Sequence, residues 1–183
     1  MNEKRRCAWC NLKNKKYVAY HDNEWCVPNF DDHYLLEMLI LESFQAGLSW
    51  ECVLNKREDF RKAFDGFDID KICDYDADKL QELMQNEKII RNKLKINAAV
   101  SNSRIFRDII KEYGTFYHYL EKFTKGKIFR EIGKTTNDLS DKISKDLNKR
   151  GMKFVGSKII YSYLQAIGVI YSHDKECFLF KKD

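Results

Sequence analysis

The fold is decided by the stretch Asp31-Asp-His-Tyr-Leu-Leu-Glu-Met-Leu-Ile-Leu-Glu-Ser-Phe-Gln-Ala-Gly47. Its first residue, Asp31, can accept hydrogen bonds from the unpaired N–H groups that begin a helix, and Gly47 can end one. Between these two signals, apolar side chains occupy nearly every face of the expected helix, whereas a surface helix carries a single apolar stripe. We therefore predict a helix that forms the buried centre of the protein.

Similar signals recur along the chain and predict one all-α domain over residues 1–183 with two helical lobes. Only one Pro and eight Gly occur, and a strand-rich fold of this length usually needs more turn residues. No alternating apolar and polar stretch is long enough to predict a sheet, and helical periodicity weakens over residues 71–76 and 122–136. Further helices are expected to begin at Ser49, Asp76, Asn92, Thr115, Ser140 and Ser157, and three of them to end at Gly114, Gly151 and Gly168.

Composition narrows the class and the location. A net charge of +5 suits contact with phosphate without proving it. No apolar signal segment follows Met1, and the longest apolar run is far shorter than the roughly 20 residues of a membrane span. We therefore expect a cytoplasmic protein without a membrane segment, whose six cysteines stay reduced. Nothing in the sequence points beyond a monomer.

Cysteine and histidine residues near both ends of the chain predict a metal site. Cys7 and His21 lie near the start, and His173 and Cys177 lie near the finish. The last two are four residues apart, which on a helical turn places both side chains on one face. Two thiolates and two imidazoles make a complete tetrahedral set for zinc, with no open position for catalysis. Such an ion would fasten the two ends of the chain together.

Spacing alone leaves the fourth ligand open. Cys7 and Cys10 form a Cys-x-x-Cys pair, a common zinc-binding spacing, so Cys10 competes with His21. These residues can also be ordinary buried thiols and hydrogen-bonded histidines.

Glu42 is the best candidate for chemistry, because a carboxylate inside an apolar helix is costly unless it pairs with a cation or faces a cavity. One interpretation is a buried salt bridge with one of the many Lys or Arg residues. The other is that Glu42 faces a pocket, accepts hydrogen bonds from a ligand and has a raised pKa.

Aromatic residues around the start of the chain and around Glu42 favour the pocket. Several of them occur in segments without helical periodicity, which favours a stacking site over a core stripe. Stacking rings together with a buried acid suit a flat, cationic heteroaromatic molecule such as a methylated purine. The residues concerned are Trp9, Tyr17, Tyr20, Trp25 and Trp50.

Four long motifs run in order along the chain: Tyr17-Val-Ala-Tyr-His-Asp-Asn-Glu-Trp25, Glu42-Ser-Phe-Gln-Ala-Gly-Leu-Ser-Trp50, Lys149-Arg-Gly-Met-Lys-Phe-Val-Gly156 and His173-x-x-x-Cys177. Through them the sequence resembles the 3-methyladenine DNA glycosylase I family, from Cys7 to about Cys177. This family is a zinc-containing branch of the helix-hairpin-helix glycosylase superfamily. The resemblance therefore implies that fold, with the N- and C-terminal segments forming the zinc-bearing lobe.

The resemblance also implies roles for individual residues. It favours His21 over Cys10 and implies one structural zinc ion held by Cys7, His21, His173 and Cys177. It implies a base pocket in which Glu42 is the catalytic or base-reading acid, and Leu48 as the wedge that fills the gap left by an extruded nucleotide. The other pocket residues would be Trp9, Tyr17, Tyr20, Trp25 and Trp50.

The implied activity is excision of N3-methyladenine from double-stranded alkylated DNA. The base would be flipped out and its N-glycosidic bond hydrolysed, which releases free 3-methyladenine and leaves an abasic site. No lysine resembles the lyase nucleophile of the superfamily, so we expect no strand cleavage.

Two departures from the family pattern stand out. Relatives often have Trp-Gly-Val-Pro where this chain has Trp25-Cys-Val-Pro28. The hairpin region, residues 88–96, contains no glycine, although superfamily hairpins use glycine to present backbone N–H groups to a phosphate. We therefore expect Arg91, Lys93 and Lys95 to carry more of the phosphate contact.

Two other classes of protein fit parts of the pattern. A zinc-stabilised nucleic-acid-binding module would bind undamaged DNA and release no base. A zinc hydrolase would need an ion with a vacant position, which the complete ligand set argues against.

Overall fold

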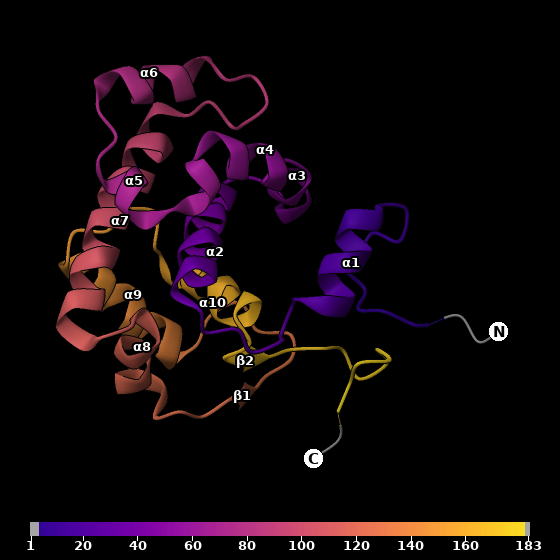
Figure 1. Ribbon diagram of the computed structural model, residues 1–183. Coiled ribbons are helices and arrows are strands. Elements are labelled where there is room, and N and C mark those ends of the chain that lie inside the picture. Colours follow the sequence, from indigo (N-terminus) through magenta and orange to yellow (C-terminus); the bar gives the residue numbers. More distant parts are fainter. Residues whose placement is uncertain (1–3, 182–183) are drawn as a thin grey trace.

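The computed structural model describes residues 4–181 and is mostly helical (Figure 1). Within this range one 3-10 turn and two short strands accompany the α-helices. The elements are α1 (Lys15–Asn23), α2 (Asp32–Gln45), α3 (Trp50–Asn55), α4 (Arg57–Ala63), η1 (Asp65–Phe67), α5 (Ile69–Cys73), α6 (Ala77–Gln85), α7 (Lys93–Tyr113), α8 (Phe116–Thr124), β1 (Phe129–Arg130), α9 (Asp138–Lys149), α10 (Ser157–Ala166) and β2 (Ile170–Tyr171).

The predicted central helix is confirmed as α2. The side chain of Asp31 caps it by accepting hydrogen bonds from the backbone N–H groups of His33 and Tyr34. Every residue of α2 from Leu35 to Phe44 is buried, and the helix packs against α3, α7, α8 and α10. In Figure 1 it runs through the middle of the molecule. It ends just before Gly47, which has the positive φ of +79° that the sequence predicts for a helix stop.

Most of the other helix starts are also confirmed. Ser49, Asp76, Asn92 and Thr115 each cap a helix through their side chains. The start of α9 was predicted wrongly, because Asn137 is the cap and Ser140 is the third helical residue of a capping box. Ser157 is the first residue of α10 and not its cap.

Several elements were not predicted from the sequence. Helix α1 is capped by Asn14 and is short and mostly polar, so its apolar periodicity is weak. The expectation of no sheet is corrected by the parallel pairing of β1 with β2, in which Phe129 faces Ile170 and Arg130 faces Tyr171. Strands of two residues are too short to produce an alternating pattern.

Segments near the two ends of the described chain are joined by a backbone hydrogen bond. The backbone N–H of Phe178 donates to the carbonyl of Arg5 at 2.8 Å. None of the helices between residues 4 and 181 has the length and apolar character needed to cross a membrane.

Candidate functional site

A cavity of about 420 Å³ lies where α1, α2, α3 and α10 meet the segments around residues 133–135 and 172–174. All six residues that the sequence assigned to a pocket line it, namely Glu42, Trp9, Tyr17, Tyr20, Trp25 and Trp50. The structure therefore brings these six side chains together around one cavity.

Glu42 lies in the cavity wall, and no basic residue between positions 4 and 181 forms an ion pair with it. The residue is only 3% exposed, and its Oε2 atom accepts no hydrogen bond within the described chain. Burial raises the pKa of the Glu42 carboxyl to about 8. The alternative of a buried salt bridge applies to Glu37 on the same helix, whose carboxylate contacts Arg57 at 2.8 Å and Arg61 at 2.7 Å.

Trp50 contributes a hydrogen-bond donor without a partner, in addition to the unpaired acceptor of Glu42. Its indole Nε1–H is buried and has no hydrogen-bond partner in the described structure, and the residue lines the same cavity. Buried polar groups in folded proteins are nearly always paired. An acceptor and a donor left unpaired in one cavity indicate a site built for a polar ligand.

The aromatic rings that line this cavity form two groups of contacting rings. Trp9 contacts Tyr17 and Trp25 with ring centroids 5.2 and 4.7 Å apart, and Tyr20 contacts Trp50 at 5.3 Å. The expectation that these residues avoid helix faces is wrong for Tyr17 and Tyr20. Both lie on α1, three residues apart and therefore on one side of the helix.

Side chains at both ends of α1 fix this helix against the rest of the protein. Asn14 accepts from the N–H groups of Lys16 and Tyr17, and its amide donates to Glu51 and Asn55 near α3. At the other end, Glu24 contacts the buried guanidinium of Arg57 at 2.6 Å. These contacts position the aromatic residues of α1 opposite Glu42.

Other lining residues could not be found from the sequence. Gln45 and Asp174 lie inside quoted motifs but were not singled out, and the topology brings them to the cavity together with residues from segments without a motif. The other lining residues are Gln45, Gly133, Lys134, Thr135, Ser162, Gln165, Ser172 and Asp174.

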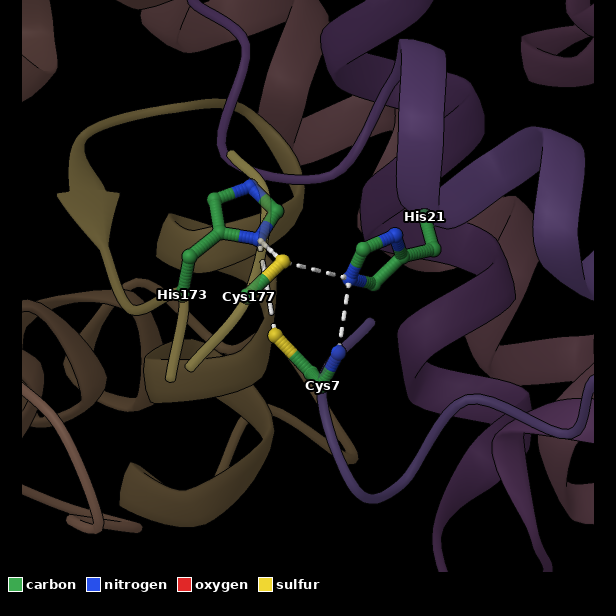
Figure 2. A group of neighbouring side chains, drawn as sticks. All are labelled: Cys7, His21, His173 and Cys177. Atoms are coloured by element: carbon green, nitrogen blue, oxygen red, sulfur yellow. Dashed lines mark hydrogen bonds between the residues drawn. The ribbon is translucent and has the colours of Figure 1, made fainter. Parts of the chain in front are cut away.

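The four predicted metal ligands also come together (Figure 2). Their ligand atoms all lie within 4.8 Å of one another, and all four residues are buried. The Nδ1 atom of His173 lies 3.5 Å from Sγ of Cys7 and 3.6 Å from Sγ of Cys177, which is 3.6 Å from Nε2 of His21. These four residues, called the Cys/His group below, could hold a metal ion. Cys10 lies outside the group, and its sulfur faces the carbonyl of Tyr17 at 4.0 Å.

The surroundings of the Cys/His group orient its members. Nδ1 of His21 lies 2.8 Å from the carboxylate of Asp22, which Arg6 contacts through two nitrogens. This leaves Nε2 of His21 to face the group. His173 and Cys177 lie on a tight turn and not on the predicted helical turn, with the N–H of Cys177 donating to Asp174 O at 2.8 Å.

The Cys/His group lies directly behind the aromatic wall of the cavity. The ring of Trp25 contacts His173 at 4.8 Å between centroids, and the ring of Trp9 contacts His21 at 5.3 Å. Whatever fixes the two histidines therefore also fixes two rings that line the cavity.

Three of the four residues predicted to contact DNA are accessible. Leu48 is 43% exposed on the turn between α2 and α3, and Arg91 and Lys93 are exposed where α7 begins. Lys95 corrects the prediction. It is buried, and its ammonium group donates to the carbonyls of Phe44 and Ala46, so it is not free to meet a phosphate.

Cys26 occupies the position within residues 25–28 where the family pattern has glycine. It adopts a positive φ of 64°, a region that favours glycine. Its sulfur accepts a hydrogen bond from the N–H of Ser172 at 3.2 Å. This contact joins the segment that carries Trp25 to the segment that carries His173.

The cavity of this helical protein sets a buried acid among aromatic faces. Comparison with known proteins gives the family. Residues 9–180 match the family described as "Methyladenine glycosylase". The DNA-3-methyladenine glycosylase 1 of Escherichia coli K12 is 40% identical, with 94% of this chain and 95% of that protein covered. The chain belongs to the methyladenine glycosylase family.

Solved structures agree with this assignment. A crystal structure of 3-methyladenine DNA glycosylase I matches with a TM-score of 0.92 and 39% identity, and covers 97% of this chain and 100% of that one. The enzyme from Staphylococcus aureus, solved to explain 3-methyladenine recognition, matches with a TM-score of 0.91 and 32% identity over 97% of both chains.

Proposed function

We propose that this protein is a DNA-repair glycosylase that excises 3-methyladenine from alkylated double-stranded DNA. The observation that carries the proposal is the unpaired acid Glu42, buried in a cavity with aromatic walls. The names of the relatives point to the same reaction.

Recognition begins with extrusion of the damaged nucleotide. A base inside a duplex cannot reach a cavity of this kind, and leaving the stack costs a few kcal/mol, less for a damaged base. We assign Leu48 to the space that the extruded nucleotide leaves in the duplex, because this side chain is apolar and exposed on the turn between α2 and α3. Helix α6, the turn over residues 86–92 and α7 would form the helix-hairpin-helix element, with Arg91 and Lys93 contacting the backbone phosphates.

The cavity then selects the base by charge. Methylation at N3 gives adenine a positive charge, which aromatic faces and a carboxylate both stabilise. The Glu42 carboxyl, whose pKa burial raises to about 8, ionises readily only when a cation arrives beside it. A neutral adenine brings no such charge and therefore binds weakly.

The same charge makes the base a good leaving group. Hydrolysis of the N-glycosidic bond by water releases 3-methyladenine and leaves an abasic site. Within the described chain, no lysine lines the cavity except Lys134, which is paired with Glu131 at 3.1 Å. We therefore propose a reaction without a lyase step.

The Cys/His group fits one structural zinc ion. Zn–S bonds of about 2.3 Å and Zn–N bonds of about 2.0–2.1 Å in a tetrahedron place sulfur and nitrogen about 3.6 Å apart. Three of the four separations between histidine nitrogens and cysteine sulfurs in this group are 3.5, 3.6 and 3.6 Å. Four protein ligands leave no position for water, so the ion would hold the two ends of the chain and take no part in hydrolysis.

The proposed function is tested by incubating the protein with N-methylated DNA and separating the released bases by chromatography. We expect release of 3-methyladenine and no release of unmodified adenine. Equal release of both bases, or of neither, would contradict the proposal. The second outcome, combined with tight binding to undamaged DNA, would identify a binding module without catalysis.

The Glu42→Gln variant separates two roles of the acid. If the variant binds free 3-methyladenine as the unchanged protein does but no longer excises it, Glu42 acts in the chemical step. If binding is lost as well, Glu42 mainly reads the base.

A further inference from the structure

Lys95 is the one lysine of the hairpin region that points into the protein. The residue is 7% exposed, although it lies in the first turn of α7 next to the exposed residues Lys93 and Leu94. Its ammonium group donates to the carbonyl of Phe44 at 2.8 Å and to that of Ala46 at 2.5 Å. Both carbonyls belong to the end of α2, where helical partners are no longer available.

Burying the ammonium group of Lys95 in the first turn of a helix is unfavourable, so nearby groups must compensate for it. A cation in the first turn of a helix faces the positive end of the helix dipole. Burial also removes water from the ammonium group and lowers the pKa of Lys95. The carbonyls at the C-terminal end of α2 supply the compensating negative end of another dipole.

A third segment closes around the same ammonium group. The ring of Phe154 lies 5.9 Å from Nζ of Lys95, and Phe154 adopts a φ of +55°, which is unusual for a bulky residue. The neighbouring Lys153 is held to α7 by two backbone hydrogen bonds with the Asn102 side chain, both 2.8 Å long. This accounts for part of the motif at residues 149–156, which the cavity does not use.

The carbonyls that Lys95 holds lie beside the turn that carries the proposed wedge. Ala46 is followed by Gly47, with a φ of +79°, and the N–H of Leu48 closes the turn by donating to Gln45 O at 2.7 Å. In the other direction along α2, Glu42 comes two residues before Phe44. One ammonium group therefore fixes the end of the helix between the acid and the wedge.

We propose that Lys95 is a positioning residue that ties the hairpin to the α2–α3 turn and so sets where Leu48 enters the DNA. This inference rests on the proposed glycosylase function. When Arg91 and Lys93 bind the phosphates, the backbone of α7 is located on the DNA, and Lys95 transfers that location to the turn. Lys95 itself does not touch DNA or the base.

The test compares Lys95→Met and Lys95→Arg with the unchanged protein. Methionine keeps an apolar stem but cannot donate to the two carbonyls, whereas arginine keeps the charge and donors. Because a misplacement of about 1 Å can cost about 100-fold in rate, we expect Lys95→Met to slow single-turnover excision from DNA by about 10- to 100-fold. Lys95→Arg should excise faster than Lys95→Met but more slowly than the unchanged protein. In both variants the affinity for free 3-methyladenine should change by less than about twofold.

Two control variants on α7 separate positioning from charge. Lys111→Met removes an exposed charge that is paired only with Asp108 within the described structure, and should leave excision unchanged. Lys93→Met should weaken DNA binding and lower the slope of log affinity against log salt by about 0.9.

A double-mutant cycle with Leu48→Ala tests the route through the wedge. If Lys95 acts by placing Leu48, Lys95→Met costs much less in the Leu48→Ala background than alone. Additive losses would overturn the proposal, and so would an equal loss of affinity for free 3-methyladenine, because that indicates collapse of the cavity. If Lys95→Met does not fold, the cycle is run with Lys95→Arg. Absence of excision by the unchanged protein would instead refute the proposed function.

Discussion

Glu42 places a titratable group in the most buried helix of the protein, and this has a measurable effect on stability. Its carboxyl has an ordinary pKa of 4.5 and a pKa of about 8 in the folded protein. Between these values the folded state holds a proton that the unfolded state has lost. The contribution of Glu42 to the free energy of unfolding therefore falls as pH rises, by about 1.4 kcal/mol per pH unit between about pH 5 and 8.

The variant Glu42→Gln should remove this dependence. We expect it to be more stable than the unchanged protein at pH 8, with the difference shrinking toward pH 5. Chemical denaturation at several pH values measures the effect. A stability difference between the two proteins that stays the same from pH 5 to pH 8 would contradict the raised pKa of Glu42.

For single residues, the sequence indicates which side chains have a chemical role better than it indicates which side chains are exposed. Glu42 could be singled out because a carboxylate in an apolar helix requires an explanation. Trp50 could be singled out because it ends the motif that Glu42 begins. Lys95 could not be separated from Lys93, because both are lysines in a basic, glycine-free stretch. Only the packing of α7 against the end of α2 shows that one is exposed and the other buried.

Helix α1 depends on Asn14 more than on its own apolar face. Replacing this cap with alanine leaves the N–H groups of Lys16 and Tyr17 without their acceptor and removes the bonds to Glu51 and Asn55. We expect Asn14→Ala to cost about 1–2 kcal/mol in the free energy of unfolding and to weaken 3-methyladenine binding.

The matched control is Asn23→Ala at the other end of α1. The exposed Asn23 side chain donates only to the carbonyl of Ala19 among the bonds found in the described chain. Its loss should change stability by less than about 0.5 kcal/mol. Denaturation curves and titration with free base compare the two variants. Similar effects from both would show that the cap does not hold α1 in place.

The end of α10 is held close to the segment before α2 by a glycine. A Cβ atom on Gly168 would lie 2.3 Å from the backbone nitrogen of Pro28, and its φ is +78°. The N–H of Cys26 also donates to Gln165 O at 2.9 Å in this region. We expect Gly168→Ala to cost about 3 kcal/mol or more, because backbone atoms must move.

Gly66→Ala is a suitable comparison, because Gly66 has a similar φ of +69° but open space around its Cβ position. Only the conformational cost, about 1 kcal/mol, should remain there. Thermal unfolding measures both variants. Equal costs would mean that the close approach at Pro28 relaxes freely.

At the scale of elements, caps predicted helix starts well where a polar cap precedes a strong apolar pattern, as at Asp31 and Asn92. Prediction failed where tertiary contacts stabilise a weak local signal. Helix α1 is held by Asn14 and Glu24 through contacts with α3 and α4, and β1 pairs with β2 over only two residues. Neither relationship leaves a periodic pattern in the sequence.

For the whole molecule, the Cys/His group predicts that metal content and stability change together. Cys177→Ser removes one of two sulfurs and should abolish stoichiometric zinc binding and lower the melting temperature, because binding free energy contributes to folding. Cys10→Ser should keep the metal, because its sulfur lies outside the group. Metal analysis and thermal unfolding check both variants. Full metal content in Cys177→Ser would contradict the assignment.

The choice between Cys10 and His21 shows what spacing cannot decide. A Cys-x-x-Cys pair is a familiar ligand spacing, but the backbone after Cys7 turns the Cys10 side chain toward Tyr17. His21 is fourteen residues away from Cys7, yet α1 brings its Nε2 atom within 3.3 Å of the Cys7 backbone N–H. Local spacing predicts a half-site, and the fold decides which four side chains come together.

Because one wall of the cavity comes from residues 9–25 and another from residues 172–174, a growing polypeptide has no complete recognition site while it is being made. The early aromatic residues leave the ribosome long before Ser172 and Asp174, which line the other wall. The cavity therefore forms only when segments far apart in the sequence come together.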